Sequence, residues 1–316
     1  MHTFSTAHTG ASADERAARA VLSWLYEPGD RRLGALVDEL GPQAAVDAGA
    51  EQTSIDYRAE LRSLPTGTDL RREATRQVEQ AQQDGMRILI PADHDWPPSL
   101  RAPDAPVCLW ALGTTPLPPP TRTVAIIGST DSTAYGTYMA SGIAYGLAES
   151  PPYTVISTGA AGIDRAALTG ALANHGHPVA LCPGGLDLRF SGPPWPQRDQ
   201  VIAEGLLLSA WPPGARPGPA RARTNQRLLS RLVAGTVLVE ADPNSRAIAA
   251  LQDTLEVGGV GMAVPGPVTS VQSAGCHALL RDDRRVRLVT NAADVTDVLL
   301  RRAGRRAWAE PAGDPR

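Results

Sequence analysis

The chain has 316 residues, of which 42% are hydrophobic and 20% charged, a composition typical of a globular protein with a sizeable core. No stretch reaches the roughly 18 apolar residues of a membrane-spanning helix, and the first residues lack the pattern of a secretory signal. We therefore expect a cytoplasmic protein without a membrane-spanning segment. Cys108, Cys182 and Cys276 form no CxxC pair, which argues against a disulfide framework or a zinc site.

The net charge of -3 is unevenly distributed along the chain. Residues 205–239 contain no carboxylate, and they carry Arg216, Arg221, Arg223, Arg227 and Arg231. Such clustering in a mildly acidic protein favours an anionic partner, with a solvated loop as the alternative. The chain has no lysine, so every fixed positive charge is a guanidinium, a group suited to bidentate phosphate contact.

The first part of the chain is predicted to be helical. Between residues 13 and 84, apolar residues recur at spacings of three and four, which predicts a small N-terminal helical, SAM-like domain over residues 1–84. Residues 86–91 and 107–113 then have the pattern of two strands, and a proline cluster follows them.

From Thr123 onward, short β-branched segments alternate regularly with helical patterns. The predicted strands are residues 123–127, 154–157, 178–182, 206–210, 236–241, 261–266 and 286–290. This alternation predicts an α/β fold with a doubly wound, mostly parallel sheet covered by helices on both faces. We place this second domain at residues 85–303 and expect a basic, disordered tail over residues 304–316.

Glycine-rich or turn-forming loops follow five of the predicted strands. They comprise residues 128–130, 157–164, 183–187, 240–245 and 264–267. In a doubly wound sheet, ligands bind beyond the carboxyl ends of the strands. Glycine and serine there let backbone N–H groups approach a phosphate, and a helix N-terminus adds a favourable partial charge. The sequence therefore predicts a phosphate-binding edge.

Familiar catalytic and cofactor signatures are missing. No GxGxxG follows the first strand of the alternating region, and a Walker motif requires the lysine that the chain lacks. His175 and His177 have no third ligand nearby in sequence, and no Ser/His/Asp or Cys/His pattern has supporting context. We therefore expect no cofactor, no metal and no catalytic residues.

Several short motifs occur in a specific order. They are VAIIGS, TAYG, a strand ending in Ser157, GID at 162–164, GGLD at 184–187, VLVEA at 237–241 and AVPG at 263–266. DHDWPPSL precedes them and SAGCHALLRD follows them. Over about residues 88–298 this order resembles the DprA/Smf family of DNA-processing proteins. The resemblance implies an extended Rossmann-like fold that binds single-stranded DNA, forms a homodimer and helps to load a RecA-type recombinase, without chemistry of its own.

Combined with the loop pattern, the resemblance gives a set of candidate DNA- and phosphate-binding residues. They are Gly128, Ser129, Thr130, Ser157, Gly159, Gly162, Asp164, Arg165, Gly184, Gly185, Arg221, Arg223, Asn225, Gln226, Arg227 and Glu240. For Asp164 we favour a helix-capping role over ligand contact. Glu240 either binds a base edge or accepts hydrogen bonds from loop amides. For Trp195 and Phe190, loop packing is favoured over stacking on bases.

The chain departs from the family pattern where the family carries arginine. Thr130 and Ala161 occupy two such positions, and Asn225-Gln226-Arg227 stands where the family has Arg-Asn-Arg. Losing about three phosphate contacts should weaken binding and flatten its salt dependence, by roughly one unit of logarithmic slope per contact. We expect Arg165, Arg221 and Arg223 to compensate. The 16 residues from 301 onward are too few for the family's C-terminal winged helix, which we expect to be absent.

A second function class stays open. A nucleotide-binding enzyme or sensor of the related Rossmann group, similar to phosphoribohydrolases or molybdenum-cofactor carriers, would explain the missing arginines. The hydrolase signature Pro-Gly-Gly-x-Gly-Thr is absent, because residues 183–185 continue into Leu186 and Asp187. The biological pathway, whether transformation, repair or maintenance of a mobile element, is also open.

Overall fold

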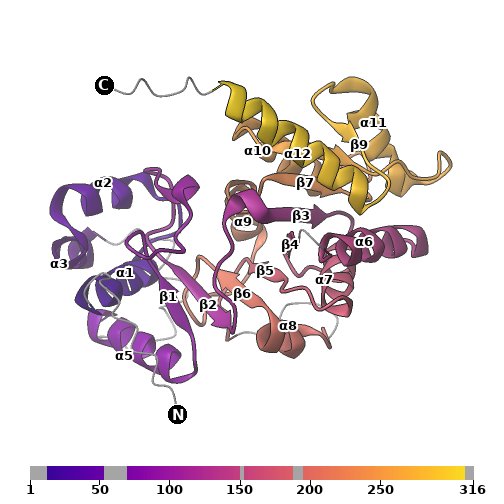
Figure 1. Ribbon diagram of the computed structural model, residues 1–316. Helices are drawn as coiled ribbons and strands as arrows, with labels where there is room; N and C mark the ends of the chain where they lie inside the picture. The colour runs from indigo at the N-terminus through magenta and orange to yellow at the C-terminus, as the bar shows by residue number, and fades with distance from the viewer. Residues whose placement is uncertain (1–12, 53–69, 150–152, 188–194, 310–316) are drawn as a thin grey trace, which may run out of the picture. The chain divides into compact units, whose positions relative to one another are not determined.

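The computed structural model describes residues 13–52, 70–149, 153–187 and 195–309 (Figure 1). The chain divides into two compact units. We call residues 1–112, 184–188 and 209–216 the N-terminal unit, and residues 113–183, 189–208 and 217–316 the sheet unit. The predicted domain boundary after residue 84 stays a prediction. In the described part of the chain, no helix is long and apolar enough to cross a membrane.

Helices dominate the N-terminal unit, as their apolar spacing predicted. They are α1 (Ala13–Leu25), α2 (Arg31–Leu40), α3 (Pro42–Gln52) and α5 (Leu70–Gln83). Their buried faces meet in a core that includes Leu22, Leu25 and Val46. The chain then forms β1 (Arg87–Leu89) and β2 (Leu109–Gly113), which pair antiparallel.

Two later segments of the chain return to the N-terminal unit. The Trp211 side chain is fully buried there, and its Nε1 donates a hydrogen bond to Glu27 over 2.7 Å. Ser209 Oγ donates to the carbonyl of Gly184 over 2.8 Å. These contacts join segments far apart in sequence, which periodicity alone does not reveal.

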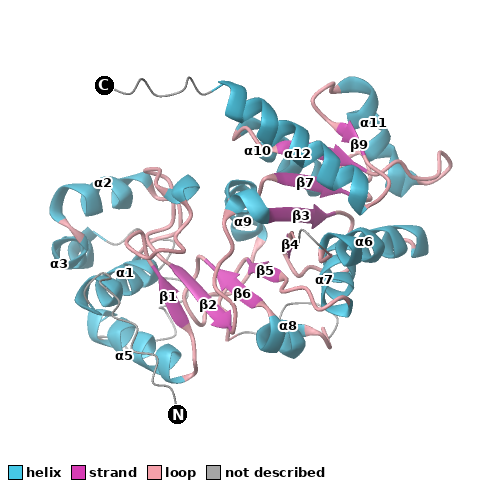
Figure 2. Cartoon of the chain, viewed as in Figure 1, coloured by secondary structure: helices cyan, strands magenta, loops and turns pink. Residues whose placement is uncertain are grey.

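The sheet unit contains most strands of the protein (Figure 2). They are β3 (Thr123–Ile127), β4 (Thr154–Ser157), β5 (Val179–Cys182), β6 (Leu206–Ser209), β7 (Gly235–Leu238), β8 (Val260–Ala263) and β9 (Arg287–Leu288). Their order is β6-β5-β4-β3-β7-β8-β9, and all pairings from β5 to β9 are parallel. After β3, the chain adds β4, β5 and β6 one after another on one side of β3. It then adds β7, β8 and β9 on the other side of β3. The topological switch point therefore lies between β3 and β7.

Helices cover both faces of this sheet. They are α6 (Ala134–Leu147), α7 (Ile163–Ala173), α8 (Arg198–Glu204), α9 (Pro219–Arg231), α10 (Arg246–Glu256), α11 (Ala274–Asp282) and α12 (Ala292–Ala309). Ile126 and Val237 pack in one core cluster with Ile143 of α6. Their neighbour Thr236 points to the other face, where its hydroxyl bonds to Thr254 of α10 over 2.7 Å. The predicted doubly wound α/β architecture is confirmed.

The C-terminal helix is longer than expected. We predicted that a disordered tail would begin at residue 304, but α12 continues to Ala309. A helical apolar pattern that includes Val295 and Leu299 anchors its first half in the core, and helix propagation then adds one hydrogen bond per residue. Residues 310–316 lie outside the described residues.

Candidate functional site

The candidate site is built from two loops at the carboxyl edge of the sheet unit. We call residues 128–133, which connect β3 to α6, the first loop. We call residues 158–162, which connect β4 to α7, the second loop. The first loop follows β3, which borders the switch point, and the second follows β4, the neighbour of β3 on its other side. Doubly wound folds bind their ligands beyond the carboxyl ends of the strands at the switch point.

Hydrogen bonds within the protein use the backbone of the first loop. The N–H of Gly128 donates to Asp164 Oδ1 over 3.2 Å, and the N–H of Ser129 donates to the carbonyl of Glu240 over 2.8 Å. The N–H of Thr133 donates to Glu240 Oε2 over 2.9 Å. We expected the Gly128 and Ser129 amides to face a phosphate, but in this structure both have protein acceptors. Thr130 is exposed at the tip of the loop.

Asp164 and Glu240 are buried carboxylates that organise these loops. Asp164 is 3% exposed and accepts hydrogen bonds from the N–H and Oγ1 of Thr158, over 3.0 and 2.5 Å, besides that from Gly128. Burial raises the pKa of the Asp164 carboxyl, and the hydrogen bonds from Thr158 oppose this rise. Asp164 therefore joins two loops instead of capping α7, whose N-cap is Gly162 without a side-chain cap. Of the two roles considered for Glu240, the structure has the second, acceptance of loop hydrogen bonds.

The second loop leaves three of its five backbone donors open, because the N–H groups of Thr158 and Ala160 already have protein acceptors. Gly159 and Gly162 have φ values of +72° and +77°, which glycine adopts without strain. Within the described residues, the N–H groups of Gly159, Ala161 and Gly162 have no acceptor. They precede the uncapped N-terminus of α7, so this loop has the donors and the partial positive charge that an anion requires. Ser157 is fully buried, and its Oγ donates to the Ile126 carbonyl over 2.6 Å, a structural contact.

Arg165 lies at the start of α7 and is held by its surroundings. Its Nε donates to the carbonyl of Gly159 over 3.1 Å, and its guanidinium lies 5.8 Å from the ring centroid of Trp195. Trp195 is only 8% exposed, in agreement with the favoured packing role. Phe190 lies outside the described residues.

The arginine-rich helix α9 contributes one exposed cation among the candidates. Arg227 is exposed and forms no ion pair within the described part of the chain. Arg223 pairs with Asp253 of α10, with Nη2 and Oδ1 2.9 Å apart, so our expectation that it compensates for a lost arginine is not supported. Arg221 is partly buried and also interacts within the protein.

Asn225 and Gln226 follow Arg223 on the same helix. Asn225 is 1% exposed, and its Nδ2 donates to the Leu181 carbonyl of β5 over 2.8 Å. Its Oδ1 and the Gln226 Oε1 are buried and have no donor among the described residues. Asn225 thus joins α9 to the sheet, and both residues retain an unpaired acceptor.

Gly184 and Gly185 belong to the N-terminal unit and not to the sheet unit. The carbonyl of Gly184 accepts from Ser209, and the N–H of Gly185 donates to the Ala215 carbonyl over 2.8 Å. These bonds hold the segment 209–216. The expectation that their backbone faces a phosphate has no support in this arrangement, because the Gly185 amide already has an acceptor.

Sequence reasoning missed Thr133, Thr158 and Gly136. Thr133 is the N-cap of α6, and a threonine directly before a helical pattern is a signal that could have identified it. A Cβ at Gly136 would collide with the Glu240 carboxylate, so this position requires glycine. No local pattern reveals that requirement, because Glu240 is 104 residues farther along the chain.

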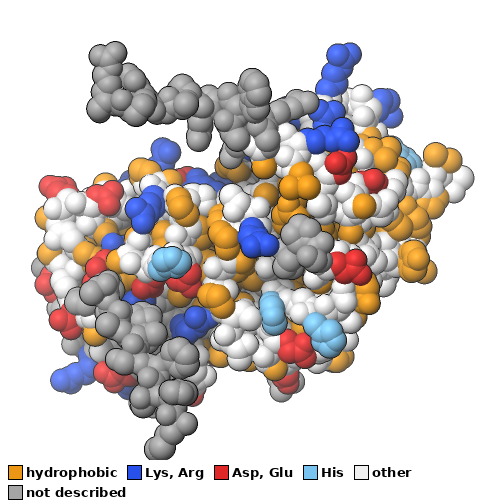
Figure 3. All heavy atoms as spheres, viewed as in Figure 1, with side chains coloured by type: hydrophobic (Ala, Val, Ile, Leu, Met, Phe, Trp, Pro, Cys, Tyr) orange, Lys and Arg blue, Asp and Glu red, His pale blue; other side chains and the backbone are white. Residues whose placement is uncertain are grey.

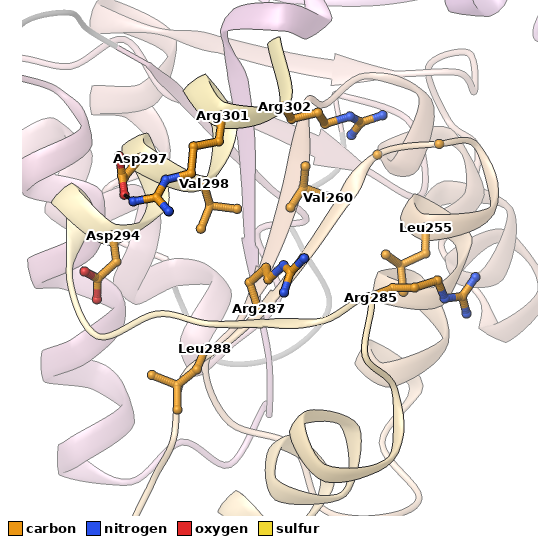
Figure 4. Close-up of a pocket in the computed structure, with 12 residues that line it drawn as sticks. Leu255, Val260, Arg285, Arg287, Leu288, Asp294, Asp297, Val298, Arg301 and Arg302 are labelled. Atoms are coloured by element: carbon orange, nitrogen blue, oxygen red, sulfur yellow. Dashed lines mark hydrogen bonds and ion pairs between the residues drawn. The ribbon is translucent and has the colours of Figure 1, made fainter. Parts of the chain in front are cut away.

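A separate groove of about 780 Å³ lies at the amino end of β8, next to β9 and α12 (Figure 4). Arginines line it, but Arg285 pairs with Glu256 over 3.1 Å and Arg301 pairs with Asp297 over 2.5 Å. Figure 3 likewise shows acidic side chains beside arginines over α12. Acidic partners neutralise two of its four lining arginines, and the groove lies at the amino end of β8 instead of the carboxyl edge of the sheet, so we leave it out of the candidate site.

Other reactive groups in the described residues are few. No cluster of three His, Cys, Asp or Glu side chains there could hold a metal ion. Cys108, Cys182 and Cys276 are buried, and burial raises the pKa of each thiol to about 12. Such thiols stay protonated at neutral pH and are poor nucleophiles.

Known proteins similar to this chain point to one family. A family model described as DNA recombination-mediator protein A matches residues 87–300. A DprA DNA processing protein of Mycobacterium tuberculosis is 35% identical over 302 residues, covering 89% of this chain and 74% of the relative. DprA of Streptococcus pneumoniae is 30% identical over 192 residues, covering 61% of this chain and 66% of the relative.

Solved structures share the fold. DprA of Streptococcus pneumoniae superposes with a TM-score of 0.67 at 23% identity, covering 89% of this chain and 97% of that one. DNA processing protein A of Helicobacter pylori, described as having a unique single-stranded DNA binding mode, gives a TM-score of 0.59 at 22% identity, covering 69% and 96%. With the family model matching more than half of its length, the chain belongs to the DprA/Smf family of DNA recombination-mediator proteins.

Proposed function

We propose that this DprA-type protein binds single-stranded DNA at the carboxyl edge of the sheet unit, without catalysing a reaction. The open N–H groups of the second loop, at the uncapped start of α7, carry the proposal. Exposed Arg227 supplies a further cation. Because binding relies on backbone donors and few arginines, we expect a shallower salt dependence than a site rich in arginine has.

Membership in a family of DNA recombination mediators supports a proposal about partners. We propose that it acts in the cytoplasm as a homodimer and helps a RecA-type recombinase to load onto the strand. Light scattering at several protein concentrations tests the dimer. Recombinase filament formation on single strands, with and without the protein, tests the loading.

The direct test of DNA binding is a titration of labelled single strands, duplexes and mononucleotides across salt concentrations. Arg227→Ala should lower single-strand affinity and reduce the logarithmic salt slope by about one, since one phosphate contact is lost. Arg223→Ala is the matched control on the same helix, because that guanidinium is already paired with Asp253. Equal slopes for the two variants would exclude Arg227 from the interface, and absence of single-strand binding would reject the function.

One observation keeps a mononucleotide ligand as the second candidate. The Asn225 Oδ1 and Gln226 Oε1 acceptors are buried and have no donor in the described part of the chain, and the exocyclic amine of a nucleobase has the chemistry to satisfy such groups. Tight binding of a mononucleotide in the same titration, weakened by Gln226→Leu, would favour this function.

A further inference from the structure

The first loop is attached to the end of β7 through one residue, Glu240. Its side chain is fully buried, and it accepts hydrogen bonds from the N–H and Oγ1 of Thr133, over 2.9 and 2.5 Å. Its backbone carbonyl accepts from the N–H of Ser129 over 2.8 Å. Glu240 thus holds the loop at both ends, where it leaves β3 and where it enters α6.

The surroundings of Glu240 are shaped around its carboxylate. Gly136, in the first turn of α6, has no side chain, and any Cβ there would collide with the carboxylate. The Thr133 Oγ1 that donates to Glu240 also accepts from the Gly136 N–H over 3.1 Å as the N-cap of α6. Helix start and loop end are therefore set by the same contact.

The first loop in turn sets the second. The carbonyl of Ser129 accepts a hydrogen bond from the N–H of Ile163 over 3.1 Å. Gly162 lies so close to the carbonyls of Ser129 and Thr130 that a Cβ would collide with both. A shift of the first loop must therefore displace Gly162, whose N–H is one of the open donors.

Burying a carboxylate without a neighbouring cation is unfavourable, because the carboxylate loses its hydration. Among the described residues, no arginine or histidine pairs with Glu240, and its hydrogen bonds to Thr133 must offset the loss of hydration. Because ionised acceptors bind their donors more tightly than neutral ones, the carboxylate fixes the loop more rigidly than an amide would.

We propose that Glu240 is a positioning residue for DNA binding. It fixes the first loop, and through Ser129 and Thr130 it fixes the direction of the open N–H groups of the second loop. This inference rests on the proposed function, because the second loop is taken as the surface that contacts the strand.

The test perturbs the Glu240 contact from both sides. Gly136→Ala introduces a methyl group against the carboxylate without changing any charge, and Glu240→Gln weakens the acceptor without adding volume. Each should accelerate amide hydrogen exchange in residues 158–163 and lower single-strand affinity about tenfold, the loss expected when one open N–H of the second loop no longer reaches an anionic phosphate. Both variants break the same contact. The single-strand affinity of the double variant should therefore equal that of whichever single variant has the lower affinity.

Gly142→Ala is the matched control, since it lies on the same helix and a Cβ there meets nothing within 4 Å. It should leave exchange and affinity unchanged. Additive losses in the double variant, or unchanged exchange in residues 158–163 for Gly136→Ala and Glu240→Gln, would overturn the positioning role. If the unmodified protein fails to bind single strands, the proposed function fails, and the exchange measurement still decides whether Glu240 sets the second loop.

Discussion

The first and second loops follow neighbouring parallel strands, contain similar small residues and meet at one edge, but they differ in which backbone amides have protein acceptors. The first loop donates its Gly128, Ser129 and Thr133 amides to protein acceptors. The second leaves three amides without an acceptor in the described residues. Among the described residues, the Thr130 and Ser132 amides of the first loop also have no acceptor, whereas the Thr158 and Ala160 amides of the second loop do have one. The comparison teaches that a glycine-rich loop after a strand predicts close approach of an acceptor, but not whether that acceptor is a ligand or the protein.

Two carboxylates hold these loops, and Asp164 accepts hydrogen bonds from both of them. Asp164 and Glu240 occupy the anion-accepting side of the first loop, much as a bound phosphate would. The first loop is held at both ends by these contacts, and its Ser129 and Thr130 carbonyls lie against the second loop, which has open donors. In this way one loop acts as a scaffold for the other.

The largest effect is expected from Gly162→Ala, which disrupts the contact between the two loops. Gly162 has φ of +77°, and a Cβ would also collide with two carbonyl oxygens of the first loop. We expect a loss of roughly 1–3 kcal/mol in the free energy of unfolding and loss of single-strand binding. Urea denaturation and DNA titration check both. If this variant binds single strands with wild-type affinity, the contrast between the loops has no bearing on binding, because DNA binding would not depend on the backbone conformation of the second loop.

An intermediate effect is expected from Asp164→Asn, because the amide places a donor among N–H and O–H donors. Burial raises the pKa of Asp164 above its ordinary 3.8, so its contribution to stability is fully present below that value and is lost as pH rises through the folded-state pKa. The unfolding free energy of wild type minus that of Asp164→Asn should therefore grow between pH 7 and pH 4. All other carboxyl groups are shared, so the subtraction removes them. A difference that shrinks toward low pH contradicts the assignment.

The smallest effect is expected from Ala161→Arg, which adds a cation to the open loop. Ala161 is partly exposed, and an arginine there should steepen the logarithmic salt slope of single-strand binding by about one without changing stability. Ala161→Gln, similar in shape but uncharged, is the control. The same slope for both variants would show that the second loop does not contact the strand.

Part of the candidate site was accessible from sequence because its signals are local. Gly159 and Gly162 were candidate site residues from sequence, and both adopt the positive φ that glycine allows, whereas Gly128, Gly184 and Gly185 do not. The acceptors of the first loop were not accessible. Asp164 lies 36 residues from Gly128, and Glu240 lies 107 residues from Thr133. Likewise, Asp253, which pairs with Arg223, lies outside the segment 205–239 that contains no carboxylate.

The sequence by itself determined the α/β architecture, the parallel sheet and the position of the loops at the strand ends, because hydrophobic periodicity and glycine act over a few residues. Tertiary structure alone decided which loop amides have protein acceptors and which arginine is paired. Those outcomes depend on whether a carboxylate from a distant part of the chain is brought within hydrogen-bonding distance, and only the folded sheet makes such neighbours.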